Sequence, residues 1–206
     1  MAQLNDLLPP GIKAALGAPL LDVVKLAYQS PGRHYHTWAH IEACLRAAAM
    51  QRFDDPFTVY AALLFHDAVY VAGAKDNEAL SARMAAAQLH THTTASAAQI
   101  ARVEHLILLT ASHGALPAEA PRDDKLLIDI DLSILAAPDA AYDIYARQVR
   151  DEWVPSVVGD AQYAHGRSAF LRGVLATPRI FHSVEFVARE AQARTNITRE
   201  LAALQP

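Results

Sequence analysis

Apolar residues recur at helical spacing along most of the chain, separated by short stretches of proline, glycine and polar residues. The segment 20–29 shows the pattern clearly, because its larger apolar residues fall on one face of a helix. Another helix is expected to start after Thr37, a suitable N-cap, and its apolar stripe extends as far as Ala49. The same period predicts further helices over 77–90, 97–110, 139–154, 160–175 and 182–204.

Two segments are less regular. Residues 1–19 contain three prolines and two glycines, so we expect a short N-terminal arm there. In 125–135 apolar and polar residues alternate as they do in a strand, but the larger apolar residues also satisfy helical spacing. We favour a helix for this segment, because its neighbours are helical in pattern.

The stretch from Ala61 to Tyr70, AALLFHDAVY, is the most apolar helical segment. Asp55 and Pro56 are a suitable N-cap and first residue for this helix. A helix that is apolar on all sides is usually buried, and a buried carboxylate must be paired or must bind a metal. His66 and Asp67 therefore form either a locally hydrogen-bonded pair in the core or part of a metal site.

The chain has 206 residues, enough for one domain with a sizeable core. Hydrophobic residues make up 52% of it and charged residues 19%, a balance that predicts a globular chain. There is no internal repeat and no linker that would divide it. We therefore expect residues 1–206 to form a single all-α domain, a bundle of about eight helices.

Charge and composition narrow the range of partners. The net charge is −4 and no Lys/Arg-rich block is present, so we expect no nucleic-acid partner. We expect no membrane association either, because no apolar run reaches the roughly 18 residues that span a bilayer. The N-terminal residues do not resemble a signal peptide, and the single Cys44 suits a reducing compartment. These features predict a cytoplasmic protein, and they leave its oligomeric state undetermined.

The ten histidines are unevenly distributed. His40 precedes the His66–Asp67 pair by 26 positions, and Asp129 and Asp131 follow much later. His40, His66, Asp67 and one of the late carboxylates could hold a metal inside a helical bundle. Nitrogen and oxygen ligands suit a divalent ion, and the spacing alone does not choose among Mn, Fe, Co, Ni, Zn and Mg.

The order His, His-Asp, Asp on an all-α scaffold resembles the HD superfamily of metal-dependent phosphohydrolases, and most closely a bacterial subgroup described as predicted HD phosphohydrolases. The resemblance implies an HD-domain-like helical fold. It also implies hydrolysis of a small phosphoester or nucleotide through a metal-activated water. The segments that carry it are RHYHTWAHI (33–41), LLFHDAVY (63–70), NEALSA (77–82), LLTASH (108–113), DIDLSIL (129–135) and ARTNITREL (193–201).

The resemblance also implies a ligand set, made up of His40, His66, Asp67 and Asp131. Asp129 competes with Asp131 for the last place. Two positions apart on a helix, their side chains point about 200° apart, so only one of them faces the metal easily. We expect Asp131 to be the ligand and Asp129 to be a solvated or capping carboxylate.

Other residues beside the motifs are candidates for catalysis or substrate binding. Glu78 and His113, together with Asp67, are expected to take part in proton transfer or catalysis. The alternative for Glu78 is a solvated acid in the first turn of a helix. We expect the phosphate of a small phosphorylated substrate to meet Arg33, His36 and Lys75.

Three alternatives remain open. The sequence LLIDIDLS (126–133) also resembles the nucleophile motif of haloacid-dehalogenase-type phosphotransferases, but the βαβ alternation which that fold needs is absent. A related helical scaffold supports di-iron oxygenases, for which His36 and His113 would be the extra ligands. The third alternative is a non-catalytic helical binding module.

Overall fold

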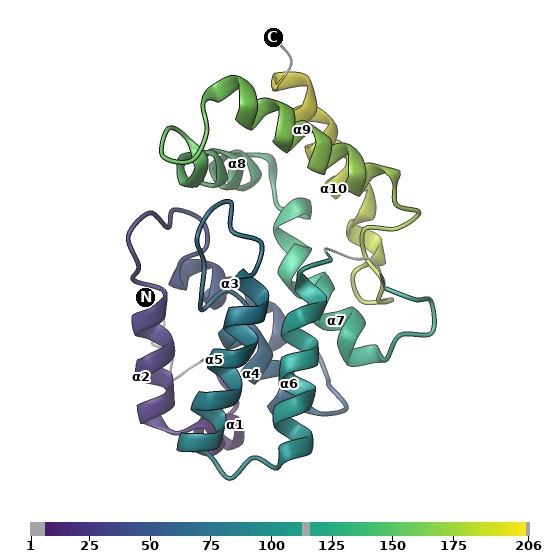
Figure 1. Ribbon diagram of the computed structural model, residues 1–206. Helices are drawn as coiled ribbons and strands as arrows, with labels where there is room; N and C mark the ends of the chain where they lie inside the picture. The colour runs from purple at the N-terminus through teal and green to yellow at the C-terminus, as the bar shows by residue number, and fades with distance from the viewer. Residues whose placement is uncertain (1–6, 113–115, 205–206) are drawn as a thin grey trace.

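The computed structural model describes residues 7–112 and 116–204, and all secondary structure within them is helical (Figure 1). The all-α prediction is confirmed. None of the described helices is both long enough and apolar enough to cross a membrane.

The elements are α1 (Pro10–Leu16), α2 (Ala18–Ala27), α3 (Trp38–Ala48), α4 (Pro56–Phe65), α5 (Asn77–His92), α6 (Ala97–Thr110), α7 (Arg122–Asp131), η2 (Leu132–Ala136), α8 (Asp139–Trp153), α9 (Asp160–Ala176), η3 (Val187–Arg189) and α10 (Glu190–Ala203).

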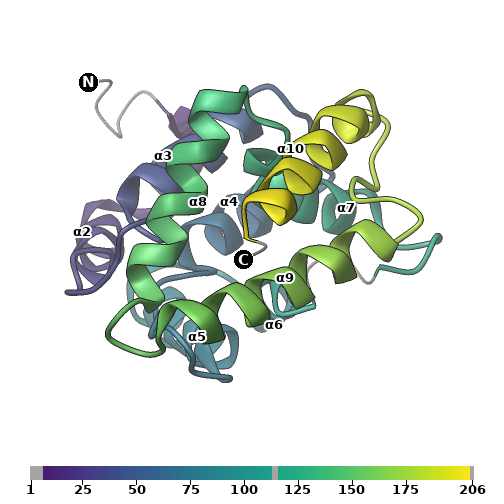
Figure 2. The same ribbon diagram turned by 90° about the horizontal axis from the view of Figure 1, so that it is seen from above.

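The helices form two groups that are joined by α7 and η2. Helices α1 to α6 make the lower bundle in Figure 1, in which α6 packs against both α4 and α5. Helices α8, α9 and α10 lie across the upper end, and α10 packs on η2 and α9. Seen from above, this upper group lies over the end of the bundle (Figure 2).

Helix α4 is the centre of the lower bundle. It contacts α1, α3, α5, α6 and α7, and every residue from Thr58 to Phe65 is buried. Its N-terminus has the predicted cap, since the Asp55 carboxylate accepts a hydrogen bond from the Thr58 amide. The apolar run therefore forms a buried helix, as its composition predicts. The helix ends at Phe65, which places His66 at the C-cap and Asp67 just beyond it.

The boundaries differ from the predicted ones at both ends of the chain. Within the expected N-terminal arm lies α1, and α2 already begins at Ala18. The prolines do not interrupt these helices, because Pro10 and Pro19 occupy first-turn positions, where no amide hydrogen bond is lost. Near the C-terminus, residues 182–189 are a loop that ends in η3 and not the start of α10.

The ambiguous segment 125–135 is helical and contains no strand. It forms the last part of α7 and then tightens into η2. The change from α-helix to 3₁₀ geometry follows directly after Asp131. The end of α7 therefore delivers Asp131 to the point where the two groups of helices meet.

Candidate metal centre

Four side chains from three separate parts of the chain meet between α3, α4 and α7. The Nε2 atoms of His40 and His66 are 3.1 Å apart. Oδ2 of Asp67 lies 3.1 Å from His66 Nε2 and 3.6 Å from His40 Nε2. Oδ1 of Asp131 lies 3.2 Å from His40 Nε2 and 3.4 Å from His66 Nε2. The structure thus brings together the four residues that the resemblance implies as ligands.

Both imidazoles are oriented by contacts on the side away from the cluster. The Nδ1–H of His66 donates to the Leu63 carbonyl at 3.0 Å, which leaves Nε2 with its lone pair. The Nδ1 of His40 lies 3.0 Å from the Tyr35 hydroxyl. Metal-bound histidines are characteristically held in this way, with one ring nitrogen fixed by a partner and the other presented to the ion.

The charged groups of the cluster shift one another's pKa values. Burial opposes the charged form of His66, but Asp67 and Asp131 outweigh burial and raise the pKa of His66 well above its ordinary value. Burial also acts to raise the pKa of Asp67, yet the charge of His66 and of its neighbours lowers it. The pKa of Asp131 is lowered in the same way. The pocket therefore favours two ionised carboxylates, which require positive charge beside them.

The donor set fits a divalent cation. The nitrogens of His40 and His66 with one oxygen of Asp67 form a compact group whose atoms lie within 4.8 Å of one another, and His40, Cys44 and Asp131 form another. Two imidazole nitrogens and two carboxylate oxygens are ligands that first-row transition metals accept. His40 and His66 are buried, whereas Asp67 and Asp131 are partly exposed, so one side of the centre is open.

Asp129 has a different role from Asp131. Its carboxylate is fully buried and accepts hydrogen bonds from the amides of His182 and Ser183, at 2.8 and 2.7 Å. The Ser183 hydroxyl donates to it as well. Asp129 therefore fixes the loop after α9 and faces away from the cluster. The expectation of a solvated or capping carboxylate is therefore wrong, because Asp129 is fully buried and its partners lie in a loop and not at a helix N-terminus.

Glu152 on α8 organises the loop that carries His36. One carboxylate oxygen accepts hydrogen bonds from the three successive amides of residues 34–36, at 2.8–2.9 Å. The other accepts from His36 Nδ1 at 2.7 Å and from the Tyr70 hydroxyl at 2.9 Å. Although burial opposes it, this set of donors lowers the pKa of Glu152 to about 2. The sequence offered one signal for Glu152, a charge placed three residues after Val149 on the apolar stripe of α8.

Arg33, which was expected to bind the substrate phosphate, instead donates its hydrogen bonds to backbone carbonyls. Its guanidinium donates to the carbonyls of His36 and Asp67, each at 2.8 Å, and to that of Ala68 at 2.9 Å. The side chain is buried, between the rings of Tyr28 and Tyr70. Arg33 therefore ties the loop before α3 to the segment that carries Asp67.

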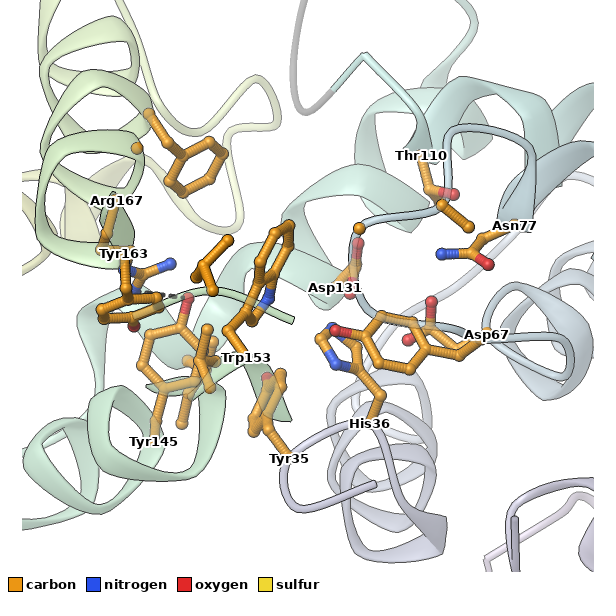
Figure 3. Close-up of a pocket in the computed structure, with 18 of the residues that line it drawn as sticks. Tyr35, His36, Asp67, Asn77, Thr110, Asp131, Tyr145, Trp153, Tyr163 and Arg167 are labelled. Carbon is orange, nitrogen blue, oxygen red and sulfur yellow. Dashed lines mark hydrogen bonds between the residues drawn. The ribbon is translucent and has the colours of Figure 1, made fainter. Parts of the chain in front are cut away.

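A cavity of about 590 Å³ opens beside the cluster, and Asp67 and Asp131 lie in its wall (Figure 3). His36 and Glu78 also line it, as expected for residues near a substrate. Lys75 is exposed and outside the residues that line this cavity. His113 lies outside the described residues.

Comparisons with protein-family models, with curated proteins and with solved structures give no match. What the fold and the site define is an all-α protein with a two-histidine, two-aspartate cluster at the wall of a cavity. The function is therefore inferred from the residues of that cluster, from the cavity and from the resemblance of the motifs.

Proposed function

We propose that this protein is a metal-dependent phosphohydrolase that acts on a small phosphoester. One observation carries the proposal: the Nε2 atoms of His40 and His66 lie 3.1 Å apart at the wall of a cavity, and each lies within 3.6 Å of a carboxylate oxygen of Asp67 and of Asp131. The motif order His40, His66–Asp67, Asp131 is that of the HD superfamily, which it resembles, and this likeness supports the same chemistry.

The residues divide into those that hold the ion and those that face the substrate. His40, His66, Asp67 and Asp131 would hold a divalent ion, which supplies polarisation of a phosphoryl oxygen and a more acidic water molecule. Asp67 is also placed to orient a water molecule, because its carboxylate reaches the cavity wall. Which ion is bound, among Mn, Fe, Co, Ni, Zn and Mg, is to be determined by measurement.

His36 and Glu78 would act on the substrate. Burial acts to lower the pKa of His36, but Asp67 and Glu152 outweigh it and raise the pKa, which favours the protonated ring. With Nδ1–H held by Glu152, the protonated ring would offer Nε2–H to a phosphate oxygen. Glu78 lies in the cavity wall and is partly exposed, a suitable position for proton transfer to the leaving group.

The experiment is elemental analysis of protein purified without chelator, followed by a phosphatase screen across small phosphoesters and nucleotides. We expect a divalent metal in the wild type and hydrolysis that is lost in Asp131→Asn. Two irons per chain with oxygen consumption would instead indicate an oxygenase. A folded protein that binds no metal would indicate a helical binding module and would overturn the proposal.

A further inference from the structure

The cavity extends well past the metal centre. At the end away from Asp67 and Asn77, Figure 3 shows Tyr145, Tyr163 and Arg167 gathered beyond Trp153. These side chains come from α8 and α9, the helices that lie across the end of the bundle. We call this part of the cavity the aromatic chamber. It is lined by Tyr145, Trp153, Tyr163, Arg167 and Phe170.

The walls of the aromatic chamber are flat and mostly apolar. The Tyr145 ring meets the Tyr35 ring edge to face, with centroids 4.6 Å apart. Aliphatic side chains of η2 and α8 complete the lining, among them Leu135 and Val149. At about 590 Å³ the whole cavity is in the size range of sites that enclose an organic ligand, about 300–1,000 Å³. A phosphate at the metal centre would occupy only one end of it.

Two polar groups in the chamber retain hydrogen-bonding capacity. Arg167 is 9% exposed; its Nε and Nη2 donate to Glu200, and Nη2 also donates to the Tyr145 hydroxyl. Among the described residues, none accepts a hydrogen bond from its Nη1. The Tyr163 hydroxyl, one helical turn earlier on α9, is buried and also lacks a partner within the described part of the chain. Such groups are expected to have partners in a folded protein, so a ligand is the natural acceptor.

The charge of the chamber is balanced. Arg167 Nε lies 2.8 Å from the Glu200 carboxylate, and both side chains are more than nine-tenths buried. The pair as a whole carries no net charge, so it does not compensate a second anionic group. A neutral carbonyl oxygen can accept the hydrogen bond from Nη1 without that cost.

We propose that the aromatic chamber is the recognition site for the organic group of the substrate. That group is planar and apolar, and it carries a neutral carbonyl oxygen which accepts a hydrogen bond from Arg167. The proposal rests on the proposed phosphohydrolase function, whose substrate class it specifies. Esters of this kind are accepted, while phosphates of small polyols leave the chamber unfilled.

Helix α9 offers a matched pair of variants. A Cβ added at Gly166, which lines the cavity, meets nothing within 4 Å, and the same is true of Gly173, which is exposed on the same helix and does not line it. Both glycines are exposed, so Gly166→Leu is expected to extend a side chain into the chamber from the cavity wall, and Gly173→Leu is its control. Both replace a helical glycine, a change that favours the helix.

The test compares three esters: umbelliferyl phosphate, which is planar and has a carbonyl; naphthyl phosphate, which is planar without one; and glycerol phosphate. Gly166→Leu is expected to raise KM for the two planar esters about tenfold or more and to leave glycerol phosphate unchanged. Arg167→Lys keeps a charge beside Glu200 and is expected to remove the preference for umbelliferyl over naphthyl phosphate. Equal KM values in Gly166→Leu and Gly173→Leu would overturn the proposal.

A second measurement separates this proposal from the phosphohydrolase function. Binding of umbelliferone, the alcohol alone, is followed by its fluorescence in metal-free protein. We expect umbelliferone to bind the wild type and Gly173→Leu, and to bind Gly166→Leu more weakly. If this pattern is found but no ester is hydrolysed, the recognition site is supported and the phosphohydrolase function is not. Absence of umbelliferone binding to the wild type would overturn the proposal that the aromatic chamber is a recognition site.

Discussion

The two carboxylates of the DIDLS sequence lie on opposite sides of α7 and do different things. Asp131 faces the histidines, whereas Asp129 is sealed against the loop at His182 and Ser183. Helical geometry predicts this separation, because side chains two positions apart point about 200° from each other. A strand would have placed both on the same face, so the helical interpretation of 125–135 decides the assignment.

Asp131→Ala is expected to reduce metal content about tenfold or more, since it removes an anionic ligand, with little change in stability. Asp129→Ala leaves two buried amides and a hydroxyl without an acceptor, so we expect the free energy of unfolding to fall by about 3 kcal/mol. Metal per folded Asp129→Ala molecule should stay near the wild-type value. Elemental analysis and chemical denaturation measure both effects, and equal metal losses in the two variants would contradict the assignment.

Glu152 makes stability depend on pH. Its pKa is lowered from an ordinary value of 4.5 to about 2 in the folded protein. Its contribution to stability is therefore complete above about pH 4.5 and is lost as the pH falls towards 2. Glu152→Gln is expected to lower the free energy of unfolding at neutral pH by about 2 kcal/mol.

Across the same acidic range, the stability of Glu152→Gln should change less steeply than that of the wild type. Denaturation curves recorded at several pH values measure the slope. The control is Glu119→Gln, at an exposed position, which should follow the wild type. If the stability of Glu152→Gln changes with pH as steeply as that of the wild type, this carboxylate is not the source of the pH dependence.

At the scale of elements, the C-terminal end of α4 is held by side chains from other segments. The last carbonyls of a helix have no partner within it. Here the Leu63 carbonyl accepts from His66, and the Leu64 carbonyl accepts from the Tyr28 hydroxyl at 3.0 Å. Arg33 satisfies the carbonyls of Asp67 and Ala68 just beyond. The position of the four-residue cluster therefore depends on the way this helix ends.

Arg33→Lys keeps the charge but loses the planar fork that reaches three carbonyls. We expect a loss of about 2 kcal/mol in the free energy of unfolding and weaker metal binding, because the Asp67 backbone is released. The control is Arg46→Lys, a surface residue paired with Glu42, which should change stability by about 0.5 kcal/mol or less. Unchanged stability with a raised KM would support the original expectation that Arg33 binds phosphate.

The sequence predicts which segments are helical better than it predicts where each helix begins and ends. Periodicity identifies α5, α6, α8 and α9 with boundaries close to those observed. It fails at 182–189, because the loop there is held by Asp129, more than 50 residues away in the chain. Local spacing contains no information about such a contact, which forms only when α7 and the last segment pack together.

At the scale of the whole molecule, the lower bundle supplies three members of the cluster and α7 brings the fourth. The upper group of α8, α9 and α10 closes the cavity beside it (Figure 1). The cluster itself is predictable from the sequence because the order of its residues resembles that of a known family. The residues that support it are not: Glu152 bonds amides 116 to 118 positions away, and Tyr35 is placed against His40 only by the folded loop.

The central claim is that His40, His66, Asp67 and Asp131 bind a divalent ion. Metal content per chain of the wild type and of Asp67→Ala, each purified without chelator and each checked for helical content by circular dichroism, tests it most directly. The account predicts a bound divalent metal in the wild type and its loss in Asp67→Ala with the helical spectrum retained. Wild-type metal content in folded Asp67→Ala would contradict it.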